Sequence, residues 1–294
     1  MSLAFLAAIV YGVYYGLLKR NLNRQFIWSY YALFFTVLFA VLVPFHDKVV
    51  MPSSGLQWAL ILFEVALLSL FFIFTSLAYK HLESSEVSPL GNLGLVLFVF
   101  VGVVFFGESL SFMQVLGVVL MMVGAFVLEV GVRVSRIKKV FASARHRKYL
   151  YYLLLAIVFS VFTGILEKIL VDPSSIGLSL DPLSPFSFNF ITRGLLMIFF
   201  LSRAFFKQEF FSGMDHVIRS VGWWVLLAAV LYNVANILYY AALASGQISL
   251  VVPITSLSTL VVVVIGGSLM HEHNVKQKMI ACAVMVFAAF LLVV

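Results

Sequence analysis

The chain has 294 residues, of which 63% are hydrophobic and only 11% are charged. Soluble domains carry roughly 25% charged residues, so most of this surface cannot face water, and the long unalternating apolar runs exclude a β-barrel and leave helices in lipid. A formal net charge of +7 would suggest nucleic acid for a soluble protein. Here the basic residues flank apolar segments, so membrane orientation explains them and we predict no nucleic-acid partner. The single cysteine lies within an apolar run, which excludes a disulfide framework.

Ten segments are apolar enough to cross a hydrocarbon core about 30 Å thick, which takes roughly 20 residues per helix. The first is expected to be a span and not a cleaved signal peptide, because no basic region precedes it and no cleavage site follows. In chain order the expected spans are 3–18, 26–44, 58–79, 87–106, 113–131, 149–171, 183–201, 221–244, 248–270 and 279–294. We therefore predict an all-α integral membrane protein with ten transmembrane helices.

A strongly basic stretch separates the fifth expected span from the sixth. Residues 133–148 contain seven Lys and Arg residues and are interpreted as the linker between a first five-helix unit, 1–132, and a second, 149–294. Counting Lys and Arg in alternate loops puts most of the charge on the linker's side of the membrane, while the other side holds little beyond Lys48 and Lys168. The positive-inside rule then places both termini outside.

The two units resemble each other in sequence. AIVYGVYYGLLK, from Ala8, matches AIVFSVFTGILE, from Ala156, and a second spacing of 164 residues places Pro89 over Pro253 and Glu108 over Glu272. Apolar helices match by chance, but a shared proline and acidic turn at one spacing favour duplication. Because each unit has an odd number of spans, the units are expected to be inverted about a pseudo-twofold axis in the membrane plane, with a substrate site between them.

Longer stretches follow one pattern over nearly the whole chain. They are the opening helix YGVYYGLLK, then YKHLESSEVSPLGNLG, then FFGESLSFMQVLGVVLMMVG with a Gly-Glu turn, and in the second unit YYAALASGQISLVVPITSL and MHEHNVKQKMIACAVMVFAAF. Their order and spacing resemble the ten-helix EamA-like branch of the drug/metabolite transporter superfamily, although His271-Glu272 replaces the second Gly-Glu turn. The resemblance implies a cavity lined by helices one to four and six to nine, supported by the fifth and tenth. It also implies cytoplasmic termini, against the charge count.

The combined expectation is a secondary active transporter that moves a small polar or amphipathic metabolite, such as an amino acid, by alternating access, with export as one direction. Protons or a counter-substrate are the expected coupling partners, in the cell membrane or an organelle membrane. No cofactor or metal is expected, since the histidines at 271 and 273 lie on a short turn that suits a closed metal site poorly. Alternatives of the same architecture are a channel, a lipid-moving protein and a scaffold. An enzyme would need a nucleophile and base at membrane depth, and we find none.

Charged residues within or near expected spans are candidates for coupling and gating. Glu64 can carry a proton, and Arg193 can bind an anionic substrate group through its planar guanidinium. An ion pair between the two, or an interfacial position for Glu64, is the structural alternative. Lys19 and Glu167 occupy equivalent positions in the two units and could form a gating pair, although each could instead extend to its own membrane interface.

Polar residues of the eighth span are the leading candidates for substrate hydrogen bonds: Tyr232, Asn233, Asn236, Tyr239 and Tyr240. Asn236 shares a helical face with Asn233 and with Tyr240, at spacings of three and four. Further candidates on other spans are Tyr11, Tyr14, Asn92, Thr255 and Ser256. For Asn and Tyr the alternative role is packing between helices, and for Tyr a second alternative is a place in the interfacial aromatic belt. For Ser and Thr the alternative is a hydrogen bond to the backbone of their own helix.

Overall fold

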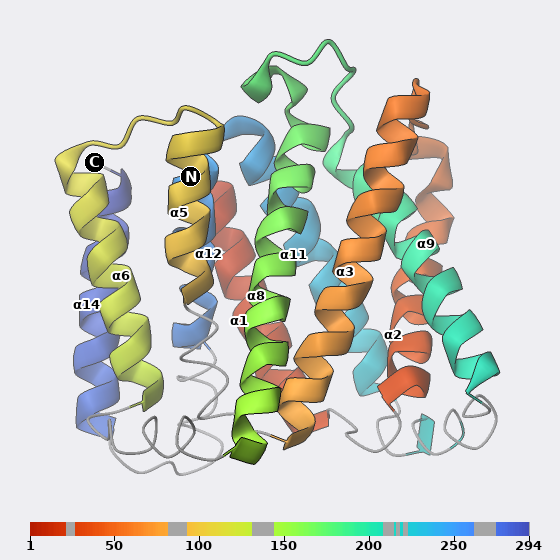
Figure 1. Ribbon diagram of the computed structural model, residues 1–294, viewed down its shortest axis with the longest axis horizontal. Helices are drawn as coiled ribbons and strands as arrows, with labels where there is room; N and C mark the ends of the chain where they lie inside the picture. Colours follow the sequence, from red (N-terminus) through yellow and green to blue (C-terminus); the bar gives the residue numbers. More distant parts are fainter. Residues whose placement is uncertain are drawn as a thin grey trace.

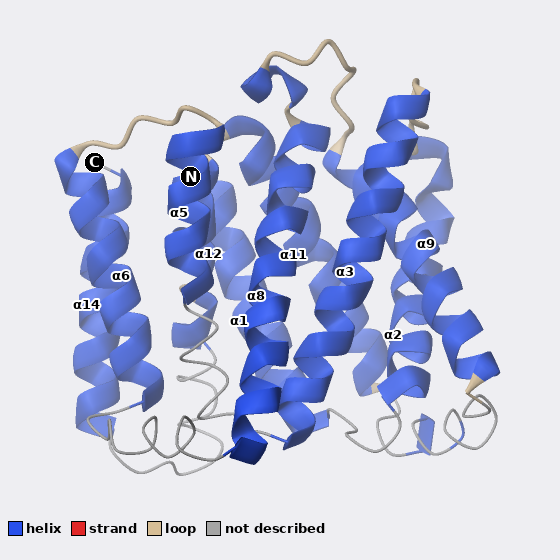
Figure 2. Cartoon of the chain, in the orientation of Figure 1, coloured by secondary structure: helices blue, strands red, loops and turns tan. Residues whose placement is uncertain are grey.

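The computed structural model is a bundle of helices that run between two ends (Figure 1). It describes residues 1–21, 27–81, 93–130, 144–207, 215, 218–219, 223–261 and 275–293. Regular structure within these residues is entirely helical, without a strand, and short loops join the helices (Figure 2). The predicted all-α class is confirmed.

The helices of the described residues divide evenly between the two halves of the chain. The first half contributes α1 (Ser2–Asn21), α2 (Ile27–Leu42), α3 (Gly55–His81), α5 (Leu93–Phe105) and α6 (Phe112–Val130). The second half contributes α8 (Ala144–Val171), α9 (Pro185–Phe206), α11 (Trp224–Ser245), α12 (Ile248–Thr255) and α14 (Val275–Val293). Two short 3-10 helices, η1 (Val43–Lys48) and η2 (Pro173–Ile176), follow α2 and α8.

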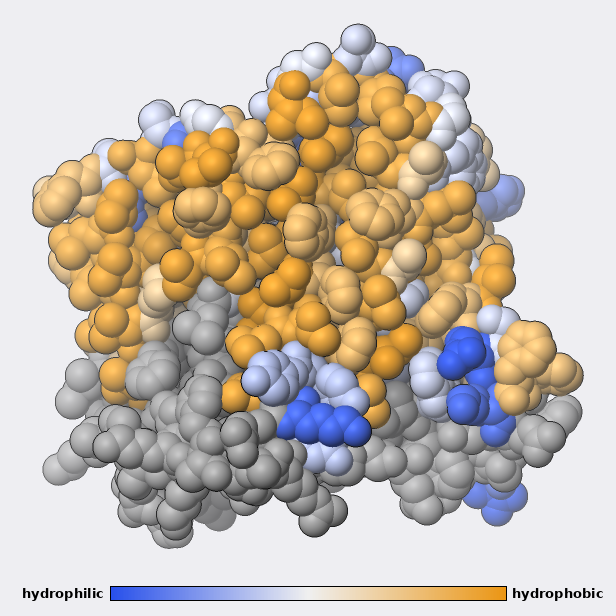
Figure 3. Space-filling model, viewed as in Figure 1, coloured by the Kyte–Doolittle hydropathy of each residue, from blue (hydrophilic) through white to orange (hydrophobic). Residues whose placement is uncertain are grey.

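Five of the described segments are long and apolar enough to cross a membrane: Trp28–Lys48, Gly55–Ala78, Lys148–Val171, Pro185–Phe206 and Trp224–Ser245. Shorter apolar helices cover Ser2–Tyr14, Gly94–Phe105, Phe112–Gly124, Ile248–Val261 and Ala281–Val293. Hydrophobic residues cover the middle of the bundle, and hydrophilic ones gather toward its ends (Figure 3). These features support an integral membrane protein with several spans, and the count of ten stays a prediction.

Several helix starts follow from local sequence. Ser54 and Gln57 form a capping box at the start of α3, in which the Gln57 amide donates to Ser54 Oγ at 3.2 Å. Ser111 and Gln114 repeat the arrangement at the start of α6, where the Ser111 amide donates to Gln114 Oε1 at 3.0 Å. Each pair satisfies amides that the first turn of a helix leaves open, so these helices begin at defined residues.

The ninth expected span differs from a continuous helix. α12 ends at Thr255, a turn covers Ser256 and Leu257, and helix resumes only over 258–261. Pro253 lies inside α12 and has no amide hydrogen to donate, and the amides of Leu257 and Thr259 bond three residues back. The helix therefore tightens and breaks after Pro253.

The most extensive helix contacts join the two halves of the chain. α1 packs against α11, α3 against α8, α2 against α9, α5 against α12, and α6 against α14. In chain order α1 corresponds to α8, α2 to α9, α3 to α11, α5 to α12 and α6 to α14. Exchanging each helix for its counterpart turns the α1–α11 pair into the α8–α3 pair and leaves the other three pairs unchanged. This pattern fits the predicted pseudo-twofold repeat.

Glycine permits the close approach of α6 and α14. A Cβ atom at Gly117 would lie 2.9 Å from the carbonyl oxygen of Ala288, and one at Gly124 would overlap the Met285 side chain. Small residues at such contacts let helix backbones pack closely in lipid.

One end of the bundle, here called the terminus face, carries the start of α1 and the end of α14 (Figure 1). The segments 43–54, 106–111, 172–184 and 246–247 also lie there, because they join helices that reach this end. The described charges on these segments are Asp47, Lys48, Glu108, Asp172 and Asp181. The terminus face is therefore mainly acidic, in keeping with the alternate-loop count, and the orientation of the chain stays a prediction.

Candidate functional site

Arg193 lies near the middle of α9 and is 1% exposed. Its Nε donates to Asn189 Oδ1 at 3.1 Å, one turn earlier on the same helix. Its Nη2 donates to Asn236 Oδ1 at 3.0 Å and to the Tyr240 hydroxyl at 3.1 Å, both on α11. The structure thus brings together three residues that the sequence predicted for the site: Arg193, Asn236 and Tyr240.

Asn189 belongs to the buried network around Arg193, and the sequence analysis did not single it out. Its Nδ2 donates to Asn233 Oδ1 at 3.0 Å, and Asn233 Nδ2 donates to the carbonyl oxygen of Leu38 at 2.9 Å. Asn233 therefore ties α11 to α2 and α9, and its amide is used in packing. The spacing of four between Asn189 and Arg193 was the signal that could have found this neighbour, because residues so spaced share a helical face.

Glu167 on α8 joins the same network. Its Oε1 accepts from the Tyr240 hydroxyl at 3.4 Å, and the side chain is buried instead of extending to an interface. We define the Arg193 cluster by the residues of this network: Glu167, Asn189, Arg193, Asn236 and Tyr240. It connects α8, α9 and α11 through buried polar groups.

Aromatic side chains from α1 and α11 lie beside the cluster. The Tyr11 hydroxyl donates to Asn236 Oδ1 at 3.1 Å, and the Tyr11 ring lies 6.0 Å from Tyr232 and 6.4 Å from Tyr239. The Tyr14 ring lies 4.7 Å from Tyr232, whose own ring lies 5.2 Å from the Arg193 guanidinium. Four of the five predicted tyrosines therefore lie together next to the charged group.

Glu64 on α3 is fully buried and lies within range of the charges of Arg193 and Glu167. Among the described residues, neither of its carboxyl oxygens has a hydrogen-bond partner, and neither does Nη1 of Arg193. The ion pairs within 4.0 Å in that part of the chain are Lys168–Asp172 and Arg219–Asp215, so Arg193 and Glu64 do not form the direct pair considered as an alternative. Within the described residues, one buried donor, Arg193 Nη1, and one buried acceptor, the Glu64 carboxyl group, therefore lack a hydrogen-bond partner.

The remaining predicted residues do not join this network. Thr255 Oγ1 donates to the Val252 carbonyl at 2.8 Å and Ser256 Oγ to the Pro253 carbonyl at 2.6 Å, which is the backbone alternative given for them. Asn92 lies outside the described residues, as does the Lys19 side chain. The Lys19–Glu167 gating pair therefore stays a prediction.

A second polar contact lies at the equivalent position of the first half. Ser76 precedes Tyr240 by 164 residues, the spacing of the repeat, and its hydroxyl donates to Tyr31 OH at 2.8 Å. The Tyr31 ring packs 5.3 Å from Phe72 and 5.2 Å from Phe200. Tyr240 therefore contacts the guanidinium of Arg193, whereas Ser76 contacts the phenol of Tyr31. The equivalent positions of the two halves thus differ in charge.

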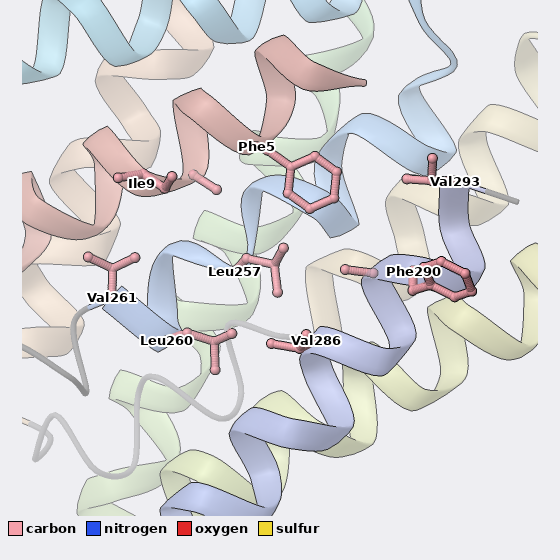
Figure 4. Close-up of a pocket in the computed structure, with 10 residues that line it drawn as sticks. Phe5, Ile9, Leu257, Leu260, Val261, Val286, Phe290 and Val293 are labelled. Atoms are coloured by element: carbon pink, nitrogen blue, oxygen red, sulfur yellow. The ribbon is translucent and has the colours of Figure 1, made fainter.

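An apolar groove of about 510 Å³ lies between α1, the segment 257–261 that follows α12, and α14 (Figure 4). It is lined by Phe5, Ala8, Ile9, Leu257, Leu260, Val261, Val286, Ala289, Phe290 and Val293. Its lining offers no charged or hydrogen-bonding side chain, and Ile9 and Phe290 are exposed. The groove suits hydrocarbon and does not suit a polar metabolite.

The model of the EamA-like transporter family matches residues 1–130 and 147–294. The chain belongs to the EamA-like transporter family. Family membership identifies a membrane transporter of the drug/metabolite type, with a small-molecule substrate and a lipid bilayer as partners, from a family that is generally non-enzymatic.

Other comparisons concern the fold. No curated protein matches the sequence. Chains of solved structures do match, 29 in number, and one crystal structure superposes with a TM-score of 0.70 at 15% identity, covering 99% of this chain and 95% of that chain. At that identity the likeness shows a shared fold alone.

Proposed function

We propose that this EamA-like protein is a secondary active transporter that moves a small polar or amphipathic metabolite by alternating access, with its substrate bound at the Arg193 cluster. The observation that carries the proposal is that Arg193 Nη1 and the Glu64 carboxyl group are both buried and find no hydrogen-bond partner among the described residues. Buried polar groups nearly always have partners, and the cost of leaving them without one is larger in lipid than at a wet surface. Such groups therefore favour a ligand or water at this position.

The chemistry of the open groups limits the substrate. Arg193 offers a charged donor to a carboxylate or another acceptor, and Glu64 offers acceptor oxygens to an ammonium or another donor. A metabolite with both kinds of group, such as an amino acid, satisfies both residues at once. The rings of Tyr11, Tyr14 and Tyr232 supply an amphipathic surface for the rest of the molecule.

The architecture that supports alternating access is two inverted five-helix units, 1–132 and 149–294, joined by the basic linker 133–148. The helix pairs between the halves, each matched by its counterpart, support this division. If the halves exchange conformations, the position between them opens first to one side and then to the other. This division predicts ten spans.

Glu64 is proposed to carry the coupling proton, because it is a fully buried carboxyl group that no donor in the described part of the chain bonds. The Glu64→Gln variant should lose the pH dependence of substrate uptake, since glutamine is similar in shape but cannot titrate. Uptake would be measured in proteoliposomes across a range of external pH, with an exposed-site control, Asp215→Asn. A pH profile of Glu64→Gln identical to that of the wild type would exclude this role.

The apolar groove is the observation that favours a lipid-moving protein as second candidate. Its lining has no polar group for a lipid head group, and the unsatisfied charges belong to residues that do not line it. The metabolite transporter therefore accounts for more of the structure.

A thermal-shift screen of detergent-purified protein against a metabolite panel tests the proposed site. A ligand that binds the folded state raises the melting temperature by mass action. Hits should lose their effect in Arg193→Met and keep it in Arg203→Met, a matched change at an exposed position of the same helix. Hits that stabilise both variants equally would place the site elsewhere.

A further inference from the structure

The turn between α11 and α12 is held by two side chains of opposite charge. Lys168 on α8 donates through Nζ to the carbonyl oxygens of Leu243, at 2.7 Å, and Gly246, at 2.9 Å. The Glu108 carboxylate accepts from the amides of Ile248, at 2.7 Å, and Ser249, at 3.0 Å, and also from the Ser249 hydroxyl. A cation thus caps the end of α11, and an anion caps the start of α12.

Each charge matches the helix end that it meets. The last carbonyls of a helix and its first amides lack partners within the helix, and the helix dipole adds partial negative charge at the first place and partial positive charge at the second. Hydrogen bonds to a charged group are about twice as strong as neutral ones. The α11–α12 turn is therefore fixed more firmly than its length of two residues would suggest.

The backbone after α5 is shaped to aim Glu108 at α12. Gly107 has a φ of 62°, a left-handed conformation that favours glycine, and the Glu108 amide donates to the Gly102 carbonyl at 3.0 Å to close the helix end. A Cβ atom at Gly102 would overlap the Glu108 carboxylate and crowd Ser249. Two glycines thus make room for the contact.

The two capping charges differ in which half of the chain they come from. Lys168 belongs to the same half as the turn that it holds, whereas Glu108 belongs to the other half. Further contacts between the halves lie on the same terminus face, where Gln57 Nε2 donates to the Asp181 carbonyl at 2.6 Å and Ser53 Oγ to Asp181 Oδ2 at 2.8 Å. Several hydrogen bonds on the terminus face therefore cross between the halves.

We propose that Glu108 is a positioning residue that holds the terminus face closed by tying the start of α12 to the α5–α6 turn, and that this contact breaks when that face opens. The inference rests on the proposed alternating access. α12 follows α11 after a turn of two residues, and α11 carries Asn236 and Tyr240. Releasing the start of α12 therefore lets these two residues move away from the first half. Lys168 keeps the turn itself intact in both states.

The test measures thiol labelling at two reporter positions on α3 in purified protein lacking the native thiol through Cys282→Ala. Ile61 lies one turn toward the terminus face from Glu64 and shares its helical face, and Ser76 lies near the other end of α3; both are buried. Ile61→Cys and Ser76→Cys would each be combined with Glu108→Gln, which removes the charge and keeps the side-chain length. Losing charged hydrogen bonds should shift the balance between states on the order of tenfold.

The expected result is opposite changes at the two reporters: faster labelling at position 61 and slower labelling at position 76. A purely structural role would speed labelling at both positions, and unchanged rates at both would also overturn the proposal. Ser249→Ala, which removes one of the bonds, should give a smaller shift in the same directions, so the test stands even if Glu108→Gln folds poorly. Lys168→Met is the matched control within one half and should not shift the two reporters in opposite directions. Because labelling needs no substrate, a failed substrate screen leaves this result interpretable.

Discussion

Replacing Arg193 by Met should remove the centre of the buried network and destabilise the protein measurably. Three hydrogen bonds from a charged donor are lost, two of them to α11, and the Glu64 and Glu167 carboxyl groups keep no cation beside them. Removing one partner of a buried charge arrangement costs about 3–5 kcal/mol. Arg193→Lys keeps the charge but cannot reach partners in several directions with one planar group, so about 2 kcal/mol is expected there.

Thermal unfolding in detergent, followed by tryptophan fluorescence, measures these effects. Arg203→Met is the control, because Arg203 is exposed on the same helix and its guanidinium lies 5.1 Å from the ring of Trp28, a contact worth about 0.5–1 kcal/mol. Adding Glu64→Gln to Arg193→Met should recover part of the lost stability by removing an uncompensated charge. If Arg193→Met unfolds at the same temperature as Arg203→Met, the cluster does not hold the bundle as described.

Two further predictions concern the site and the terminus face. Asn236→Ala and Tyr240→Phe should each lower the initial rate of uptake at least tenfold, while surface labelling shows normal membrane insertion. Full uptake by both variants would remove Asn236 and Tyr240 from the site. Burial raises the pKa of Asp172, but hydrogen bonds from Lys168 and Ser174 outweigh it and leave the pKa below its ordinary value. The ionised carboxylate therefore stabilises the fold above about pH 4, and this stabilisation is lost in stronger acid. Asp172→Asn should lower the melting temperature at pH 7, and the further fall in melting temperature on acidification should be smaller than in the wild type.

The elements of this fold were largely predictable, because whether a helix can span a membrane depends mainly on its length and its apolar composition. The positions of the long spans and the two-repeat layout both follow from residues read in order. The break after α12 was harder to foresee, since Pro253 near the start of a helix is compatible with a continuous span. There the side chains of Thr255 and Ser256 bond their own backbone, and only the folded chain shows that they do.

The site could be predicted by residue type but not by partner. Arg193 and the polar residues of α11 were selected because a charged group or an amide at membrane depth requires a polar partner. That Arg193 bonds Asn236 and Tyr240, and leaves Glu64 open, depends on how α3, α9 and α11 meet, which no spacing within one helix determines. Asn189 was within reach of the same argument, because it lies one turn from Arg193.

The most direct test of the transport mechanism is counterflow in proteoliposomes with a substrate found by the thermal-shift screen. Vesicles preloaded with the unlabelled compound should take up labelled compound faster than empty vesicles and accumulate it transiently, because a carrier that alternates between two faces exchanges one bound molecule for another. Arg193→Met should abolish the effect. Labelled compound that only equilibrates, at a rate independent of preloading, would contradict alternating access and point to a channel.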